Sequence, residues 1–391
     1  MKILNICSVP VTYQGGSERV ILELSKRMAK ENNVTILQTS LYEDDIFIGQ
    51  TKIDGIEIIT CKNDRYLGGY GYSKEFKKTL KRIYKDFDII HIYGYGRFTS
   101  NFSMKFLHKR KPFLFSSHGF FHDKKHSIFK KIHNILFSRL MKKADCCCAL
   151  SEVEKEQYIS FGVNENKIKI FPGGITPTKY NFDNEKIEEL KKKYLSEEEK
   201  EKVIMLYVGR LHESKGIQHV IKSIKNVDVK FLIVGRDAGY KEELEKLIEQ
   251  EEVKDKVKFV GVVNDDELKE IYAISDFFVL FSSHEGFGIV VIEAMNAGLP
   301  VIVSNMGSLP TLVKEDINGY VVGYLNIDEL EEDIILLTKN KNLRLRIGEN
   351  AKVFSQKFDW NNIAKNHLEL YQEILDDDND KIYKSLMERY P

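Results

Sequence analysis

Short apolar runs alternate with amphipathic helical stretches along most of this chain, and that alternation limits the folds open to it. In the first half we expect strands at residues 2–7, 34–38, 88–92, 113–117, 146–150 and 167–171. A helix is expected at 17–30, where Val20, Ile21, Leu24 and Met28 recur at helical spacing. Strands that alternate with helices predict βαβ units, and therefore mostly parallel sheets covered by helices on both faces.

The pattern stops once and then begins again. Phe171-Pro172-Gly173-Gly174-Ile175 is rich in breakers, and a highly charged segment follows to about Lys202. New strands are then expected at residues 203–208, 229–234, 257–260, 277–280 and 301–304. Because 391 residues exceed one typical domain, we expect an α/β protein of two doubly wound, Rossmann-like domains, 1–172 and 173–359. Ligands of such sheets bind beyond the carboxyl ends of the strands, and here we expect them in an interdomain cleft.

Charge and cysteine content argue against several classes of protein. Lysine plus arginine and aspartate plus glutamate both total 59, so the chain lacks the basic excess of a dedicated nucleic-acid binder. Its cysteines are Cys7, Cys61 and the run 146–148, without a C-x-x-C pair, which favours buried free thiols over a metal site or disulfides. The N-terminus reads as a strand rather than a signal peptide, and no run of about 18 apolar residues occurs, so we expect a cytoplasmic protein.

Two glycine-containing loops follow predicted strands of the first half. Gly15-Gly16-Ser17-Glu18 opens a helix, where free N–H groups and close backbone approach favour an anion; a purely structural turn is the alternative. His118-Gly119 comes directly after the strand at 113–117. A histidine there could hydrogen-bond a sugar hydroxyl or a developing charge.

A third loop, residues 209–216, follows the first strand of the second half. Arg210 and Lys215 lie five residues apart between Gly209 and Gly216, so both side chains could bind one diphosphate. Two solvated surface cations are the alternative.

The fourth and most specific motif runs from Glu285 to Met295. After the strand at 277–280 it places Gly286 and Gly288 before a helix, so the N–H groups of Phe287, Gly288 and Ile289 can point at phosphate oxygens. Glu293 lies on an otherwise apolar helix face, and a buried carboxylate needs a partner. Two ribose hydroxyls would serve, and so would an internal arginine.

These motifs together resemble those of a known family. E-G-F-G-x4-E-A-M-x2-G-x-P-V, from Glu285 to Val301, is similar to the signature of retaining glycosyltransferases of the GT-B fold, in the large family-four group. The loops at 15–19 and 209–216 resemble that group's glycine loop and phosphate clamp, and Phe358-Asp359-Trp360 resembles the start of its closing helix. The resemblance covers nearly the whole chain. It departs at Thr311, where many members have glutamate, and at His284, a variable position.

The resemblance implies roles for particular residues. Arg210 and Lys215 would bind the donor diphosphate, assisted by backbone at Gly16, Phe287 and Gly288. Glu293 would bind the ribose hydroxyls, Glu285 the sugar hydroxyls, and His118 would lie beside the donor sugar. The first domain, 1–172, would lie on the acceptor side, and the second, 173–359, would bind the nucleotide-sugar donor. A C-terminal helix, about 360–391, would pack back on the first domain. The family's reaction retains the anomeric configuration and uses no bound metal or cofactor.

Several questions stay open at the level of the sequence. The base of the donor would bind near Val260-Gly261, but the base, the sugar, the linkage and the acceptor (a saccharide, a lipid-linked glycan or a small molecule) are not readable. A nucleotide-sugar epimerase of the GT-B fold and a non-catalytic nucleotide-sugar-binding subunit are the alternative functions. Residues 105–143 carry eleven lysines or arginines and one acidic residue, Asp123. Segment 124–143 could therefore dock on anionic lipid, or it could be an ordinary sheet-covering helix.

Overall fold

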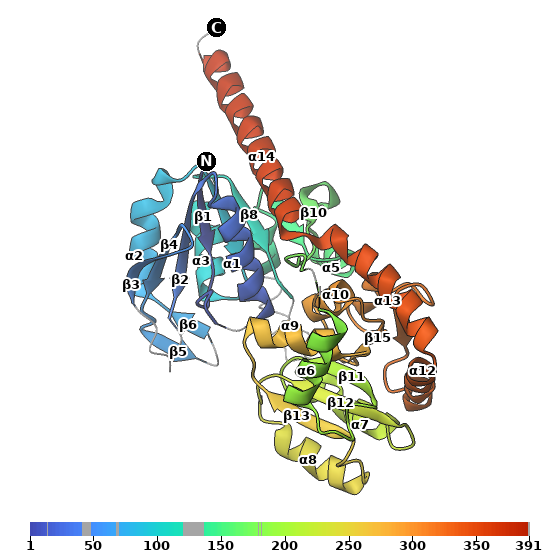
Figure 1. Cartoon of the computed structure of the whole chain (residues 1–391). Helices are drawn as coiled ribbons and strands as arrows, with labels where there is room; N and C mark the ends of the chain where they lie inside the picture. Colours follow the sequence, from blue (N-terminus) through green and yellow to red (C-terminus); the bar gives the residue numbers. More distant parts are fainter. Residues whose placement is uncertain are drawn as a thin grey trace. The chain divides into compact units, whose positions relative to one another are not determined.

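The structure, a computed structural model, describes residues 1–13, 15–40, 48–67, 70–119, 137–178, 180 and 182–389. The chain divides into two compact units (Figure 1). Unit 1 comprises Met1–Gly174 and the segment from Trp360 onward, and unit 2 comprises Ile175–Asp359. The chain thus passes from unit 1 into unit 2 near Gly174 and returns at Trp360.

Unit 1 is built on one mixed sheet in the order β10-β9-β8-β7-β1-β2-β4-β3. Its strands are β1 (Lys2–Ile6), β2 (Asn33–Thr39), β3 (Gly49–Ile53), β4 (Ile56–Cys61), β7 (Ile89–Tyr93), β8 (Phe113–Ser116), β9 (Cys146–Ala149) and β10 (Ile168–Ile170). All neighbours pair in parallel except β3 with β4. Because β1 lies centrally, between β2 and β7, its Ile3, Leu4 and Ile6 are fully buried.

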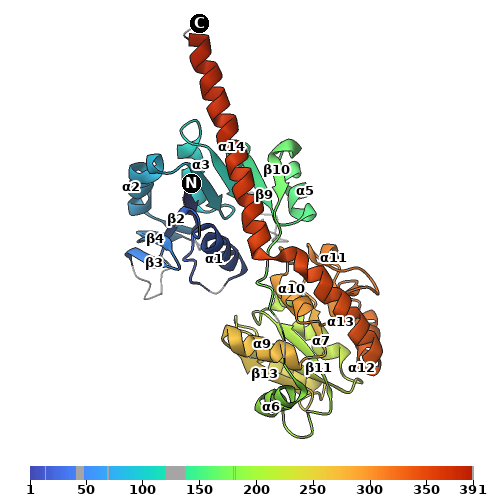
Figure 2. The same cartoon turned by 45° about the horizontal axis from the view of Figure 1, so that its top comes forward.

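Helices cover both faces of this sheet. They are α1 (Gly16–Met28), α2 (Lys74–Ile83), α3 (Phe98–Leu107), α5 (Glu152–Ser160) and α14 (Trp360–Arg389). Phe76 of α2, Met104 of α3 and Tyr158 of α5 share one core cluster with Leu4 and Ile6 of β1. Figures 1 and 2 show α14 beside α1, so the last helix of the chain completes the cover of the first domain.

A short hairpin and two single-turn helices complete the regular elements of unit 1 in its described part. Strands β5 (Arg65–Leu67) and β6 (Tyr70–Tyr72) pair antiparallel outside the main sheet. The 3-10 helices are η1 (Tyr84–Asp86) and η2 (Glu165–Lys167). All five cysteines of the chain are buried, as the sequence predicts, and they are free thiols.

Unit 2 holds a parallel sheet in the order β13-β12-β11-β14-β15-β16. Its strands are β11 (Val203–Val208), β12 (Val229–Val234), β13 (Val257–Gly261), β14 (Phe277–Leu280), β15 (Val301–Ser304) and β16 (Gly319–Val322). Its helices are α6 (Asn184–Tyr194), α7 (Ile217–Ser223), α8 (Lys241–Gln250), α9 (Asp265–Ile274), α10 (Ile289–Asn296), α11 (Leu309–Leu312), α12 (Ile327–Lys339) and α13 (Lys341–Ser355), with 3-10 turns η3 (Glu213–Lys215) and η4 (Gln356–Phe358).

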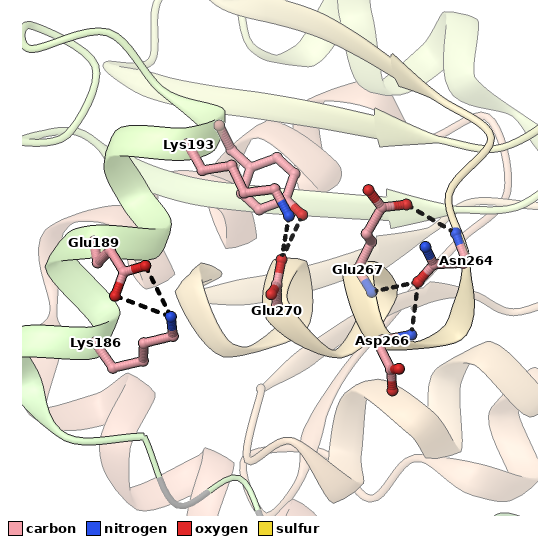
Figure 3. A network of polar contacts seen from close by, with 8 residues as sticks. Lys186, Glu189, Lys193, Asn264, Asp266, Glu267 and Glu270 are labelled. Atoms are coloured by element: carbon pink, nitrogen blue, oxygen red, sulfur yellow. Dashed lines mark hydrogen bonds and ion pairs between the residues drawn. The ribbon is translucent and has the colours of Figure 1, made fainter.

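Polar contacts fix α6 against α9 in unit 2 (Figure 3). The Lys193 ammonium and the Tyr194 hydroxyl each donate to Glu270 Oε2 at 2.7 Å. Asn264 caps α9 by accepting from the Glu267 N–H at 2.9 Å, while the Glu267 carboxylate accepts from the Asn264 N–H. This reciprocal cap fixes the start of α9 at Asp265.

A run of acidic residues such as Asp376–Asp380 is typical of a solvated turn, but this run lies inside α14. No glycine or proline occurs between Trp360 and Arg389, so nothing interrupts the backbone hydrogen bonds there. No helix in the described part of the chain is both long and apolar enough to cross a bilayer.

Most of the basic segment 124–143 lies outside the described residues. Of its last part, residues 137–141 are helical, and Phe137 and Met141 are buried in the core of unit 1. This end of the segment therefore covers the sheet, whereas Lys142 and Lys143 follow it at the surface.

Candidate active site

In unit 2, the loop at 209–216 is fixed by its backbone. Gly209 N–H donates to Val234 O at 2.9 Å, and Leu211 N–H donates to Arg236 O at 2.8 Å, so the loop continues the pairing of β11 with β12. The Tyr207 hydroxyl donates to Arg210 O at 2.9 Å. The Arg210 side chain is left exposed at the carboxyl end of the sheet.

Gly216 joins this loop to the segment that follows β14. Its φ of +71° is left-handed, and a Cβ there would lie 1.9 Å from Phe281 O, so only glycine fits. Beside it, Ser283 N–H donates to Ser214 O at 2.8 Å. Two loops distant in sequence are thereby held in contact.

Lys215 and Glu285 meet as a consequence of that contact. Lys215 Nζ lies 2.6 Å from Glu285 Oε2, and their side chains are 16% and 19% exposed. The sequence assigns Lys215 to the diphosphate and Glu285 to the sugar, and the structure pairs them with each other. An ammonium has three donors, so Lys215 can keep this bond and still donate to a phosphate oxygen.

The glycines of the fourth motif shape a helix N-terminus. Gly288 caps α10 with a left-handed φ of +94°, and a Cβ at Gly286 would meet nothing within 4 Å. The backbone N–H groups of Phe287, Gly288 and Ile289 make no hydrogen bond within the described part of the chain. Free N–H groups at the positive end of a helix dipole form an anion site.

Glu293 lies one turn into α10. It is 9% exposed, and the Tyr272 hydroxyl donates to its Oε2 at 3.3 Å. The carboxylate therefore has a phenol from α9 among its partners. Gly261, which ends β13 with φ of +88°, would meet nothing with an added Cβ, and the following Val262 is 57% exposed. An apolar side chain is thus presented at the carboxyl end of that strand, where the sequence predicts the base.

In unit 1, Gly15 and Gly16 begin α1, and the two glycines differ. A Cβ at Gly15 would lie 2.1 Å from Glu18 Oε2, because the Glu18 side chain folds back over the helix start. A Cβ at Gly16 would meet nothing. A Cβ at Gly15 would thus only displace the end of a flexible side chain, while Gly16 borders open space.

His118 lies just after β8 in a left-handed conformation, with φ of +51°. Its ring meets the Tyr93 ring edge-on, with centroids 5.2 Å apart, and its Nδ1 has no hydrogen-bond partner in the described part of the chain. Burial, reinforced by His367, lowers the pKa of His118 to about 4. The imidazole is therefore neutral at physiological pH and can exchange hydrogen bonds with a neutral ligand.

Two residues of α5, neither of them a site residue expected from the sequence, hold the His118 loop. Glu154 Oε1 accepts from the Gly119 N–H at 3.1 Å and from the Ser117 hydroxyl. The Tyr158 hydroxyl accepts from the Ser117 N–H at 2.7 Å. Glu154 is 4% exposed, and burial raises the pKa of its carboxyl.

The only signal for Glu154 in the sequence is the pattern Ser151-x-x-Glu154, which predicts a capping box. Ser151 does cap α5, since its hydroxyl accepts from the Glu154 N–H at 3.3 Å. The reciprocal bond differs from the prediction, because the Glu154 carboxylate accepts from the Leu150 N–H instead. The side chain is turned toward the His118 loop.

The predicted site residues fall into two groups. Gly15, Gly16 and His118 belong to unit 1. A cavity of about 120 Å³ in this unit, called the His118 cavity, is lined by His118, Glu18, Tyr93 and Arg97. The other group, in unit 2, comprises Arg210, Lys215, Gly261, Glu285, Gly286, Phe287, Gly288, Ile289 and Glu293. Two Rossmann-like units, each with candidate ligand-binding residues beyond its strands, define the GT-B class of fold.

Comparison with known proteins supports this class. The family model described as "Glycosyl transferases group 1" matches residues 186–354, and that described as "Glycosyltransferase Family 4" matches residues 14–179. An uncharacterized glycosyltransferase of Methanocaldococcus jannaschii is 30% identical over 317 residues, covering 77% of this chain and 79% of the relative. The chain therefore belongs to the group 1 glycosyltransferases.

Other proteins are similar to this chain in sequence or in fold. N-acetyl-alpha-D-glucosaminyl L-malate synthase of Bacillus anthracis is 31% identical over 56% of this chain and 60% of its own length. Sucrose-phosphate synthase of Thermosynechococcus elongatus has a TM-score of 0.78 at 20% identity, covering 96% of this chain and 99% of that one. Anabaena HepE in complex with UDP-glucose has a TM-score of 0.77 at 20% identity, covering 95% and 100%. The predicted GT-B fold is confirmed.

Proposed function

We propose that this protein is a retaining glycosyltransferase that transfers a sugar from a nucleoside-diphosphate donor to a hydroxyl group of an acceptor. The observation that carries the proposal is the gathering in unit 2 of Lys215, Glu285 and the start of α10, with Glu293 one turn further on. HepE, a structural neighbour, binds UDP-glucose, which supports a donor of this kind.

Each of these groups has a part in donor binding. The free N–H groups of Phe287 to Ile289 and the Lys215 ammonium bind the diphosphate, with Arg210 free to add its guanidinium. Glu293 accepts hydrogen bonds from the ribose hydroxyls. Glu285, already beside Lys215, accepts from a hydroxyl of the sugar and so places the sugar next to the phosphate that leaves. The exposed Val262 beside Gly261 packs on the base.

The reaction breaks the bond between the anomeric carbon and the diphosphate oxygen and forms a bond from that carbon to the acceptor oxygen. The products are the glycoside, the nucleoside diphosphate and the proton of the acceptor hydroxyl. Lys215, Arg210 and the α10 amides compensate the charge that develops on the diphosphate, which is work that a metal ion does in other transferases. We therefore expect transfer without added metal.

A panel of nucleotide sugars tests the proposal. UDP-glucose, UDP-galactose, UDP-N-acetylglucosamine, GDP-mannose and ADP-glucose are compared by thermal shift, and the donor that binds is then followed by NMR with a mixture of acceptors, with and without EDTA. We expect an α-linked product from an α-linked donor, formed equally in EDTA. Release of an epimerised nucleotide sugar would indicate the epimerase alternative, and binding of none of the donors would end the proposal.

A further inference from the structure

A second segment of unit 2 packs against the loop that leads into α10, and it has no role so far. It is the turn at residues 305–308, which joins β15 to α11. A Cβ at Gly307, where φ is +60°, would lie 2.3 Å from Glu285 O. A Cβ at Gly288 would lie 2.9 Å from a methyl carbon of Leu309, the first residue of α11. The two glycines therefore allow the turn to lie directly along the backbone of this loop.

Ser308 binds the loop before α10 at two successive carbonyl groups. Its hydroxyl donates to Gly286 O at 2.5 Å and, more weakly, to Glu285 O at 3.2 Å. Its N–H donates to Glu285 O at 3.2 Å as well. Ser308 is 1% exposed, so water does not compete for these hydrogen bonds.

The orientation of these two carbonyl groups sets that of the amides that follow them. Both peptides are trans and planar, so each C=O and its N–H point in opposite directions. Because Glu285 O and Gly286 O are turned toward Ser308, the N–H groups of Gly286 and Phe287 are turned away from it. Neither N–H makes a hydrogen bond to any residue that the structure describes. Both are therefore open to a ligand at the start of α10.

The peptide at Gly286 depends on hydrogen bonds for its orientation. Glycine reaches backbone conformations that are closed to other residues, so a peptide beside it rotates easily. A Cβ at Gly286 would meet no atom within 4 Å, which shows that packing does not hold this residue. The Ser308 hydroxyl supplies the restraint that packing does not.

Thr311, a position at which the sequence departs from the family that it resembles, holds Ser308 in turn. Its hydroxyl donates to Ser308 O at 2.6 Å, and its N–H donates to the same oxygen at 3.1 Å. An ionised glutamate side chain at this position would have no proton to donate to that carbonyl. Thr311, Ser308 and Gly286 therefore form one chain of hydrogen bonds.

We infer that Ser308 is a positioning residue for the donor diphosphate, because it directs the amides of Gly286 and Phe287 toward the ligand. The inference rests on the proposed function and deepens it at the start of α10. Ser308 itself does not contact the donor, since it is buried and its hydroxyl proton is already donated. Without that hydroxyl the peptides rotate, and the apparent affinity falls in proportion to the fraction of molecules whose amides are correctly turned.

Titration calorimetry and NMR on the full chain test this role. Calorimetry with UDP, GDP and ADP identifies the diphosphate that binds, and saturation-transfer NMR follows the matching nucleoside. Ser308→Ala removes the hydroxyl and keeps the N–H. We expect it to weaken binding of the diphosphate about fivefold, the effect of one hydrogen bond. The affinity for the nucleoside should not change, because a nucleoside has no phosphate for the amides to bind.

Two further variants separate positioning from an effect on folding. Thr311→Val removes the hydroxyl of an exposed residue, and we expect about a twofold loss of diphosphate affinity. Ser223→Ala is the matched control, because Ser223 is fully buried in the same unit and its hydroxyl donates to Val220 O at 2.9 Å in the last turn of α7. It should lower the stability of the protein about as much as Ser308→Ala and change neither affinity.

The outcomes distinguish this inference from the proposed function. Unchanged diphosphate affinity in Ser308→Ala, an equal loss of affinity for the nucleoside, or an equal loss in Ser223→Ala would each overturn the positioning role and leave the donor site standing. If Ser308→Ala does not fold, the same comparisons with Thr311→Val decide the point. Failure of all three diphosphates to bind the folded, unaltered protein would count against the proposed function itself.

Discussion

At the scale of single residues, the candidate site depends on contacts that no local pattern encodes. Lys215 and Glu285 are separated by 70 positions, yet the glycine at 216 and the backbone bond from Ser283 bring their charges within 2.6 Å. Each partner then sets the electrostatic environment of the other. Replacing Lys215 and replacing Glu285 should therefore change the affinity for the nucleotide in opposite directions.

We expect Lys215→Ala to weaken UDP binding and to lower kcat/KM by about 30- to 150-fold, the loss of one charge-assisted contact of about 2–3 kcal/mol. Glu285→Gln should instead tighten UDP binding by about three- to tenfold, because it frees the ammonium from its carboxylate, while kcat falls through the lost sugar contact. Titration calorimetry with UDP and steady-state kinetics measure both effects. Lys246→Ala, at an exposed pair on α8, is the control. Equal UDP affinity in both site variants would contradict the roles given to this pair.

Glu154 acts on the His118 loop through hydrogen bonds rather than through contact with substrate. Glu154→Gln keeps the size of the side chain and its accepting oxygen but replaces the second oxygen with a donor that faces the Leu150 N–H. We expect kcat to fall about tenfold or more, the result of a misplaced loop, with the donor KM unchanged. Ser117→Ala should give a smaller effect of the same kind. A proportional rise in donor KM would instead indicate that Glu154 contacts the donor site.

At the scale of elements, much of the fold can be predicted from the sequence, because its central strands are continuous apolar runs. The strands expected at 203–208, 229–234, 277–280 and 301–304 occur with those bounds. The strands not expected from the sequence are β3, β4, β5, β6 and β16. Residues of β3 are mostly exposed, and the three-residue strands β5 and β6 are too short to show a period. The β5–β6 hairpin lines a cavity of about 260 Å³ in unit 1, so this cavity could not be found from the sequence.

Part of the candidate site could likewise be predicted from the sequence, and part could not. Its glycine loops could be located because a loop after a parallel strand has a predictable place. The pairing of Lys215 with Glu285, and of Glu154 with the loop at 117–119, could not, since both depend on how separate elements pack. The residue roles that the family resemblance implies stay predictions, and the variants above test them.

Helix α14 brings a buried histidine to the His118 side of unit 1. His367 Nδ1 donates to Ile363 O at 2.9 Å, and burial lowers the pKa of the His367 imidazole to about 4. A pKa lowered in the folded state means that the unfolded chain binds the proton more tightly. Stability is therefore complete above the unfolded pKa of about 6.5 and is lost as the pH falls toward 4.

We expect the free energy of unfolding to fall by about 2–3 kcal/mol for each such histidine between pH 6.5 and 4.5. His367→Gln removes one of these buried imidazoles and keeps an amide that can donate to Ile363 O. The stability of this variant should therefore depend less steeply on pH. Urea denaturation at the two pH values measures the difference. At the half-buried His108 of the same unit, desolvation and the charge of Lys143 also lower the imidazole pKa, so His108→Gln should reduce the slope by less than His367→Gln. If the free energy of unfolding of His367→Gln depends on pH as steeply as that of the unaltered protein, this histidine is already protonated in the folded protein.

Helix α12 carries a carboxyl with the opposite sign of shift. Burial, reinforced by the negative charge of Glu315, raises the pKa of Asp333 to about 7. The folded state then holds the proton more tightly than the unfolded chain, so this group destabilises the protein as the pH rises through 7. Because Asp333 is only half-buried, we expect Asp333→Asn to stabilise the protein by about 1 kcal/mol at pH 8 and by little at pH 5. Thermal melts at both pH values, with Asp328→Asn as control, give the comparison; greater stabilisation at pH 5 would contradict it.

At the scale of the whole molecule, the chain forms its two units by leaving unit 1 and returning to it. Within unit 1, a Cβ at Gly174 would lie 2.7 Å from the Trp360 ring, so the outgoing and returning segments pack directly against each other. Within unit 2, Ile175 N–H donates to Phe358 O at 2.7 Å. Each unit thus closes its own pair of segments, and each has a core of its own. The chain's one tryptophan, 1% exposed, lies in unit 1.

Trp360 makes the two units separately observable during unfolding. Tryptophan fluorescence follows unit 1, whereas far-UV circular dichroism follows both units. If the proposed donor site is in unit 2, UDP at about 100 times its Kd adds about 2.7 kcal/mol to the stability of that unit. For a unit of this size the gain corresponds to a rise in Tm of about 5–10 °C. We expect UDP to move the dichroism melt by this amount and the Trp360 fluorescence melt by less, and Lys215→Ala to remove most of the shift. A larger shift at Trp360 than in the dichroism would place the nucleotide in unit 1, because mass action stabilises the unit that holds the ligand.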